Sequence, residues 1–441
     1  MNYKKAAAGV ICALMMCGMG AQTSAETANV EQSEAESSAK GKKVRILCHY
    51  DPTNNGKSYA AKQYKKKYGA NVQWVKTEWD TRFNDLSTYV LSGKGIDLFV
   101  MDDAVLPKSI VNNMVQPVGQ YVKVSESTFS KFGTAMNSYK FDGKYYALVT
   151  NVNAANVVYY NKKTIKKNGL EDPYTLWKDG KWNWDTFKSE LEAFVDPEEG
   201  RYGLDGYYFE QALGYSAGKS AVSSNKGKLV SNLRSKNLAK AMRFGESLYN
   251  DGLIMDKADF EWQQQPQFLG EGKELFYIGG TWLIESAPSD WSFNIKPADL
   301  GVVPVPSPKG YNNYMYASAE GYVLLEDSDN PEGAVKFAEL QAQGNLNKSN
   351  IAAVQKTQKN KYKWSNTTIK TIREINDTAK KYPVFEFAAG VSSDVASITI
   401  NGGDEIGVRG PFHGESWSDY VNDAGDVVEI LVNEANDYIN E

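Results

Sequence analysis

The stretch Ile96-Asp97-Leu98-Phe99-Val100-Met101 is an almost uninterrupted apolar run, and it decides the fold class. Two similar apolar runs precede it, at 44–47 and 72–75. Amphipathic segments at 58–68 and 80–91 separate the three runs, with apolar residues at helical spacing. Strands that alternate with helices in so short a stretch predict βαβ units and a parallel sheet, so we expect an α/β protein.

The chain length indicates more than one lobe. The chain has 441 residues, about three times the usual domain of roughly 150 residues. A single apolar core stops growing at about 250–300 residues, so two lobes are expected. The formal charge of −5 gives no reason to expect a polyanionic partner, and nucleic-acid binding is disfavoured.

The first residues are typical of an export signal. Lys4 and Lys5 precede an apolar stretch at 6–21, and a small-residue cleavage site ends at Ala25, so residues 1–25 are predicted to be a signal peptide. Residues 26–43 contain no aromatic residue and are interpreted as a disordered tether. The protein is therefore expected outside the cytoplasm, at the cell surface or in the periplasm.

Cys17 offers a second way to process the same segment. It follows Leu14-Met15-Met16, which resembles a bacterial lipobox, although Met16 departs from the small residue of that pattern. Lipidation of Cys17 and cleavage after Ala25 are both open. No later segment is long and apolar enough to span a bilayer, so contact with the membrane is expected only through such an anchor.

Few residues of the mature chain are suited to catalysis or metal binding. Only His49 and His413 supply imidazole, and Cys48 is the single cysteine beyond the signal. The mature chain contains no G-x-S-x-G, H-E-x-x-H or CxxC motif. We expect no cofactor, no metal and no enzymatic activity.

Ligands of open α/β sheets bind beyond the carboxyl ends of the strands. Asp51 follows the first predicted strand, Asp102 and Asp103 follow the third, and Trp282 follows a later one. Adjacent residues at a strand end point in opposite directions, so Asp102 and Asp103 cannot act together on one bond. We expect one to accept hydroxyl hydrogens from a ligand and the other to cap the next helix.

The 27 tyrosines and 10 tryptophans are the most informative residues. Most are expected in the core. Three aromatic residues are instead predicted in turns: Trp282 in Gly-Gly-Thr-Trp, Trp417 before the last helix, and Tyr208 in Tyr-Tyr-Phe. A ring on a loop can stack on the C–H face of a sugar. Together with Asp51, Asp102 and Asp103, these three residues are the predicted ligand-binding set.

Several segments, taken in order, carry a family resemblance. They are LSGKGIDLF at 91–99, YYAL at 145–148, VYYNK at 158–162, KWNWD at 181–185, FLGEGK at 268–273 and GVVPVP at 301–306. In their order and spacing the chain resembles the extracellular solute-binding proteins of bacterial ABC importers, in the sugar-binding group related to maltose-binding protein.

The resemblance implies a two-lobed clamshell joined by hinge crossings, with a sugar between the lobes. One lobe would comprise 44–149 plus 304–345, and the other 150–303 plus 346–441. Trp282 would be the stacking platform and Trp417 a further aromatic contact. The resemblance also implies a monomer that delivers a carbohydrate to the permease subunits of an ABC transporter.

Two other functions stay open on the sequence. An exported glycoside hydrolase would need two carboxyl groups that face each other across a sugar. A carbohydrate-sensing surface protein would need the same binding site without a transporter.

Overall fold

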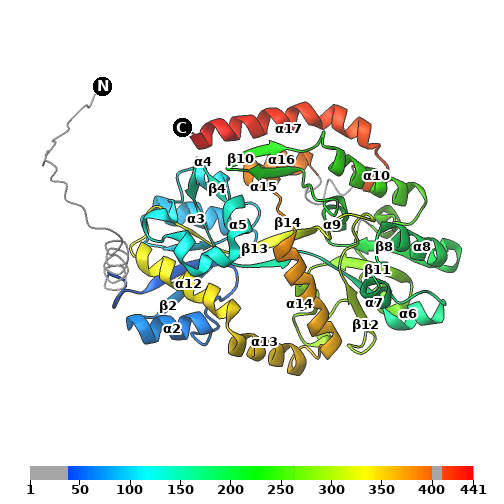
Figure 1. Ribbon diagram of the computed structural model, residues 1–441, viewed down its shortest axis with the longest axis horizontal. Coiled ribbons are helices and arrows are strands. Elements are labelled where there is room, and N and C mark those ends of the chain that lie inside the picture. Colours follow the sequence, from blue (N-terminus) through cyan, green and yellow to red (C-terminus); the bar gives the residue numbers. More distant parts are fainter. Residues whose placement is uncertain (1–37, 262, 400–409, 441) are drawn as a thin grey trace, which may run out of the picture.

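The computed structural model describes residues 38–261, 263–399 and 410–440. The predicted signal peptide, Cys17 and most of the predicted tether lie outside these residues. Two separate sheets, each covered by helices, form two lobes (Figure 1). The predicted α/β, two-lobed fold is confirmed.

The sheet of lobe 1 has the strand order β14-β13-β3-β1-β2, and β6 also pairs with β13. Its first strand is parallel to both β2 and β3, as the βαβ pattern predicts. By contrast, β13 is antiparallel to β3 and β6. The strands are β1 (Val44–Cys48), β2 (Val72–Lys76), β3 (Leu98–Val100), β6 (Ala147–Ala154), β13 (Met315–Leu324) and β14 (Pro383–Val384).

The helices of lobe 1 begin and end where local chemistry favours it. At the start of α2, the Ser58 hydroxyl accepts the Ala61 N–H, and Gly69 ends the helix in a left-handed conformation. The long helix α12 packs on α2 and β6. The helices are α2 (Tyr59–Tyr68), α3 (Arg82–Leu91), α4 (Lys108–Val111), α5 (Gly133–Ser138) and α12 (Pro331–Leu346).

The end of the predicted tether belongs to lobe 1. Ala39 is fully buried. The Gly41 N–H donates to the Tyr68 carbonyl at 2.8 Å, and the Tyr64 hydroxyl donates to the Lys42 carbonyl at 3.1 Å. The predicted tether of 26–43 is therefore too long, because these contacts fix its last residues to α2.

The sheet of lobe 2 has the order β12-β7-β11-β8. Here β7 is antiparallel to both neighbours, while β11 and β8 are parallel. The strands are β7 (Val157–Asn161), β8 (Tyr202–Gly206), β11 (Glu274–Gly279) and β12 (Leu300–Val303). The helices are α6 (Lys162–Lys167), α7 (Pro173–Lys178), α8 (Trp184–Phe194), α9 (Phe209–Gly214), α10 (Lys236–Asn250) and α11 (Gln267–Glu271).

Two long strands join the lobes. Along their length β6 and β13 pair from Ala317↔Ala154 to Val323↔Ala147, with a bulge between Glu320 and Gly321. Beyond this ladder β6 leads into β7 of lobe 2. A further connection runs from α12 of lobe 1 through α13 (Lys348–Asn360) to α14 (Asn366–Lys381), which packs on both β6 and β12.

The C-terminal helix α17 (Trp417–Asn440) lies over both lobes (Figure 1). It packs on α10 of lobe 2, on α4 of lobe 1 and on β10. The segment 346–441, which the sequence assigns to lobe 2, is therefore not confined to that lobe. The remaining elements are β4 (Lys140–Phe141), β5 (Lys144–Tyr145), β9 (Val222–Asn225), β10 (Lys228–Ser231), α15 (Ala388–Val391) and α16 (Ser393–Ile398).

A buried carboxylate fixes the chain that leads to these C-terminal elements. Glu386 is 1% exposed and accepts four backbone N–H groups, at 221–222 and 387–388, over 2.8 to 3.0 Å. The Tyr215 hydroxyl also donates to it. One side chain therefore satisfies donors from two segments that are distant in sequence.

We predict that Glu386→Ala lowers the free energy of unfolding by about 3 kcal/mol, because several buried donors lose their acceptor at roughly 1–3 kcal/mol each. Urea unfolding measures this loss. Glu434→Ala, at an exposed position of α17, is the control and should change the value by less than about 0.5 kcal/mol. Equal losses in the two variants would contradict the assignment.

Candidate functional site

Lobe 1 presents aromatic side chains where its parallel strands end. Tyr50 follows β1 and Trp79 follows β2, and both are about half exposed. The ring of His49 lies edge-on to both, with centroids 5.0 Å from Tyr50 and 4.9 Å from Trp79. The three rings form one wall, in the position that the strand-end rule predicts for ligand-binding residues.

Arg82 of α3 holds this wall in place. Its guanidinium lies 3.7 Å from the Trp79 ring centroid, and its Nε donates to Asp102 Oδ2 at 2.8 Å. The other Asp102 oxygen accepts the Ala104 N–H at 2.8 Å. Partial burial and the Arg82 charge lower the pKa of His49, so its ring is neutral at physiological pH.

Asp103 makes different contacts from Asp102. Its carboxylate accepts the Tyr316 hydroxyl at 2.6 Å. Burial raises the pKa of Asp103 to about 7, against the opposing effect of that hydrogen bond, and the charges of Asp102 and Glu386 raise it further. The two adjacent aspartates thus serve separate partners.

Asp51 organises the turn after β1. One carboxylate oxygen accepts the Thr53 N–H at 2.8 Å and its hydroxyl at 2.6 Å, and the other accepts the Asn55 N–H at 2.6 Å. Burial would raise the pKa of Asp51, but these hydrogen bonds outweigh it and lower the pKa. Its oxygens already hold the backbone that leads to α2.

Lobe 2 presents Trp282 on the short 3₁₀ helix Thr281–Ile284, directly after β11. Its indole is 55% exposed and lies 5.4 Å from the Tyr207 ring centroid. The Trp364 indole N–H donates to the Ile284 carbonyl at 2.8 Å and fixes the end of this helix. Tyr208 is 57% exposed and has a left-handed backbone with φ of 61°.

Glu320 lies on β13, one of the two strands that join the lobes, at the bulge. Its carboxylate accepts amide N–H groups from Asn153 at 2.7 Å and Asn151 at 3.3 Å. The side chain keeps access to solvent, yet the surrounding protein raises its pKa, the charge of Glu285 raises it further and Lys380 lowers it.

Glu320 interacts electrostatically with a residue of each lobe, Tyr50 in lobe 1 and Glu285 in lobe 2. Although the Tyr50 side chain is about half exposed, the protein around its hydroxyl raises its pKa, and the charge of Glu320 raises it further. Glu285, one residue beyond the 3₁₀ helix that carries Trp282, acts on Glu320. Tyr50, Trp79, Glu320, Tyr207 and Trp282 are called the interlobe residues below.

Trp417 lies elsewhere. It is 3% exposed and stacks on Tyr420 with centroids 5.3 Å apart. Its backbone N–H donates to Glu246 of α10 at 3.3 Å and so ties the start of α17 to α10. The buried indole has almost no surface to offer a ligand. The sequence places Trp417 in a turn before a helix, and this context suits a buried packing residue as well as a ligand-binding one.

Sequence reasoning missed Tyr50, Trp79 and Glu320. The strand-end rule that selected Asp51 could also have selected Tyr50 and Trp79, since Tyr50 follows β1 and Trp79 follows β2. For Glu320 the signal is a lone acid, followed by glycine, within an apolar strand. Within residues 38–261, 263–399 and 410–440, no three His, Cys, Asp or Glu side chains gather as a metal site would require.

The sequence matches the family of bacterial extracellular solute-binding proteins over residues 51–342. The chain belongs to this family. Two proteins named as binding proteins, from Brucella abortus strain 2308 and Brucella suis biovar 1 strain 1330, are each 23% identical over 286 residues, which cover 62% of this chain and 64% of the relative. The chain thus spans less than two thirds of the length of these relatives.

Solved structures of similar proteins share the fold of this solute-binding protein. A Staphylococcus aureus extracellular solute-binding protein in complex with maltose has a TM-score of 0.62 at 18% identity, covering 89% of this chain and 99% of the other. The cyclic α-maltosyl-1,6-maltose binding protein of Arthrobacter globiformis has a TM-score of 0.66 at 14% identity, with the same coverages.

A third structure is the ABC transporter associated binding protein of B. animalis subsp. lactis in complex with β-1,6-galactobiose. It has a TM-score of 0.60 at 16% identity, and the alignment covers 90% of this chain and 98% of the other. The family expected from the sequence is confirmed. In the described part of this solute-binding protein, every helix is too short or too polar to cross a bilayer.

Asp103→Asn should gain stability relative to the wild type as the pH rises. The folded pKa of Asp103, about 7, lies above its ordinary value of 3.8, so the folded wild type loses stability between these values as ionisation becomes favourable in the unfolded chain. Asparagine cannot ionise and still accepts from Tyr316.

Urea unfolding at about pH 4.5 and about pH 8 measures this difference. Asp437→Asn, at an exposed position of α17, is the matched control and should show no such trend. A gap between Asp103→Asn and wild type that is the same at both pH values would contradict the raised pKa.

Proposed function

We propose that this protein captures a carbohydrate between its two lobes and delivers it to the membrane subunits of an ABC transporter. The observation that carries the proposal is the set of interlobe residues, with exposed rings on each lobe and the Glu320 carboxylate on a strand that joins the lobes. Exposed aromatic rings suit the apolar faces of sugars, and a carboxylate suits their hydroxyls.

Relatives with bound ligands support a carbohydrate. Neighbouring structures hold maltose, β-1,6-galactobiose and, in an ABC substrate-binding protein from Listeria monocytogenes, cycloalternan. These ligands share pyranose rings with one apolar face and several hydroxyls. The exposed aromatic rings of this chain suit the apolar face, and the Glu320 carboxylate suits the hydroxyls.

Glu320 is suited to fix the orientation of the sugar. A carboxylate has about four acceptor positions, and Asn151 and Asn153 occupy only two of them. The remaining lone pairs can accept hydroxyl hydrogens. The amides also hold the carboxylate in one orientation, so less freedom is lost when a ligand binds.

Capture works through a shift between an open and a closed arrangement of the lobes. A ligand that contacts Trp79 and Tyr50 on one side and Trp282 on the other stabilises the closed arrangement, because only there does it touch both walls. Micromolar affinity corresponds to about 8 kcal/mol, which a few stacked rings and charge-assisted hydrogen bonds can supply. The closed form would dock on the permease as a monomer and release the sugar unaltered.

Trp282→Ala should weaken saccharide binding at least about tenfold, since a stacked ring contributes more than about 1.4 kcal/mol. Calorimetry of the wild type against maltose, maltotetraose and β-1,6-galactobiose identifies the ligand, and the variant is then titrated with it. Tyr438→Ala removes a ring that is 61% exposed on α17 and serves as the control.

Thermal unfolding confirms that both variants are folded. Chromatography of the ligand after incubation tests for hydrolysis. Absence of binding to every saccharide in the wild type, a hydrolysed ligand, or equal affinities of Trp282→Ala and Tyr438→Ala would each overturn the proposal. Loss of sugar uptake on gene deletion separates transport from sensing.

The N-terminal segment supports export and attachment to the membrane. We propose that the N-terminal segment directs export, and that the mature chain then begins either at Glu26 or at a lipidated Cys17. Mass spectrometry of the mature N-terminus distinguishes the two. With a lipidated Cys17, Cys17→Ser should release the protein from the membrane fraction into the medium, whereas a mature chain that starts at Glu26 would reject the anchor and retain the export signal.

A further inference from the structure

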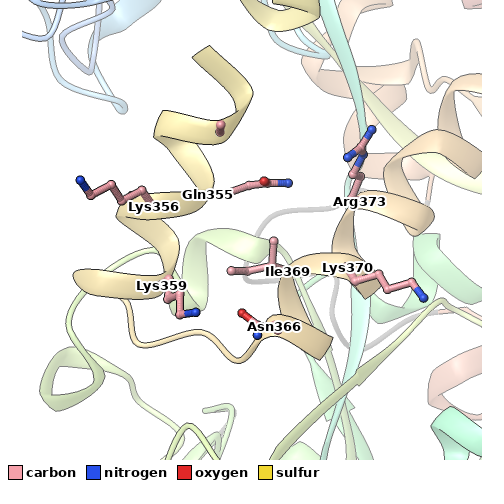
Figure 2. A pocket seen from close by; sticks show the side chains of 8 residues that line it. Gln355, Lys356, Lys359, Asn366, Ile369, Lys370 and Arg373 are labelled. Atoms are coloured by element: carbon pink, nitrogen blue, oxygen red, sulfur yellow. The ribbon is translucent and has the colours of Figure 1, made fainter. Parts of the chain in front are cut away.

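A groove outside the interlobe residues lies between α13 and α14 (Figure 2). It has a volume of about 390 Å³ and is open to solvent on one side. Figure 2 shows Gln355 extending from α13 toward α14, with Ile369 reaching back from α14. The lining residues are Ala352, Gln355, Lys356, Lys359, Asn366, Ile369, Lys370 and Arg373.

The groove exists because the two helices do not pack closely along their length. None of the residues of α13 is buried, and toward α14 the helix offers the small Ala352 and the polar Gln355. Ile369 is the single large apolar side chain of the lining. A space of this size fits one or two sugar rings, since small-molecule sites begin at about 300 Å³.

The charge of this helical pair is opposite to that of the protein. Residues 348–381 contain nine lysines and arginines and two acids, a net charge of +7, whereas the whole chain carries −5. All four cations of the lining are exposed. Among the described residues, no carboxylate lies within ion-pair distance of Lys356, Lys359 or Arg373, and Lys370 has only Glu374 at 4.0 Å.

Four cations line the groove, of which Lys356 and Lys370 extend away from the facing helix in Figure 2, and like charges in one place favour an anion nearby. The start of α14, at Asn366, adds the positive end of a helix dipole to the same groove. Ile369 and Ala352 supply an apolar floor, and the amides of Gln355 and Asn366 supply hydrogen-bond groups. This combination matches a sugar ring that bears an oxyanion.

We propose that the groove between α13 and α14 binds an acidic sugar, that is, a saccharide carrying a sulfate, phosphate or carboxylate group. Lys359 or Arg373, which lie at opposite ends of the groove in Figure 2, would pair with the oxyanion, Gln355 and Asn366 with hydroxyls, and Ile369 would contact the apolar face of the ring. This second site goes beyond the proposed function, because none of its lining residues is an interlobe residue.

The groove is nevertheless connected to the candidate site. The loop between α13 and α14 carries Trp364, which donates to Ile284 at the end of the helix that bears Trp282. Lys380, at the other end of α14, acts on the carboxylate of Glu320. The two helices of the groove are therefore linked to the helix that bears Trp282 through the hydrogen bond of Trp364.

Calorimetry at constant ionic strength tests the proposal on the mature protein. The probes are glucose, glucose 6-sulfate, glucose 6-phosphate, glucuronate and sodium sulfate. We expect at least one of the three acidic sugars to bind at least about tenfold more tightly than glucose and than sulfate alone. The variant Lys356→Gln/Lys359→Gln/Arg373→Gln should lose about tenfold or more in that affinity.

A charge-matched variant provides the control. Lys348→Gln/Lys361→Gln/Lys381→Gln removes the same charge from the same helical pair outside the groove and should retain the affinity. Trp282→Ala should also retain it, so failure of the interlobe site and failure of the groove can be told apart.

Three outcomes would overturn the proposal. Equal losses of affinity in the two triple variants would show that the overall positive charge of the helical pair, and not the groove, attracts the acidic sugar. Equal affinity for sodium sulfate and glucose 6-sulfate would assign the groove to free oxyanions. Binding to phosphatidylglycerol vesicles that depends on the groove lysines, without binding of any acidic sugar, would assign it to a membrane surface.

Discussion

The pairing of β6 with β13 is the constraint on which the rest of the molecule depends. These strands complete the sheet of lobe 1 and also lead into lobe 2, so one ladder of hydrogen bonds positions both lobes. The bulge at Glu320 interrupts this ladder. A bulge turns a side chain out of the regular alternation, and here it presents a carboxylate where residues of both lobes lie near it.

The sequence was informative wherever a local pattern determines the structure. The apolar runs around Ile96 predicted the parallel part of the lobe 1 sheet, and the strand-end rule placed Trp282 correctly at the end of β11. Such features depend on neighbours a few residues away. Glu320 could not be found in this way, because its partners Asn151 and Asn153 are distant in sequence and only strand pairing brings them close.

The sequence was less informative where tertiary packing, and not a local pattern, determines the role of a residue. Trp417 begins an amphipathic helix, and nothing local in the sequence says that its ring is buried. Asp51 follows a strand as a ligand-binding acid would, and the backbone of its own turn donates to both of its oxygens, so a ligand contact of Asp51 stays a prediction. The basic residues of α13 and α14 stand out in the sequence as charge, but the groove between them arises from how the two helices pack.

The position of α17 has a consequence for motion between the lobes. This helix contacts α4 of lobe 1 and α10 of lobe 2, so a single helix bridges the two lobes. Any rotation of one lobe against the other would therefore have to shift or break contacts of α17 with α4 or α10. The free energy of these contacts would oppose the rotation in addition to the bending of β6 and β13.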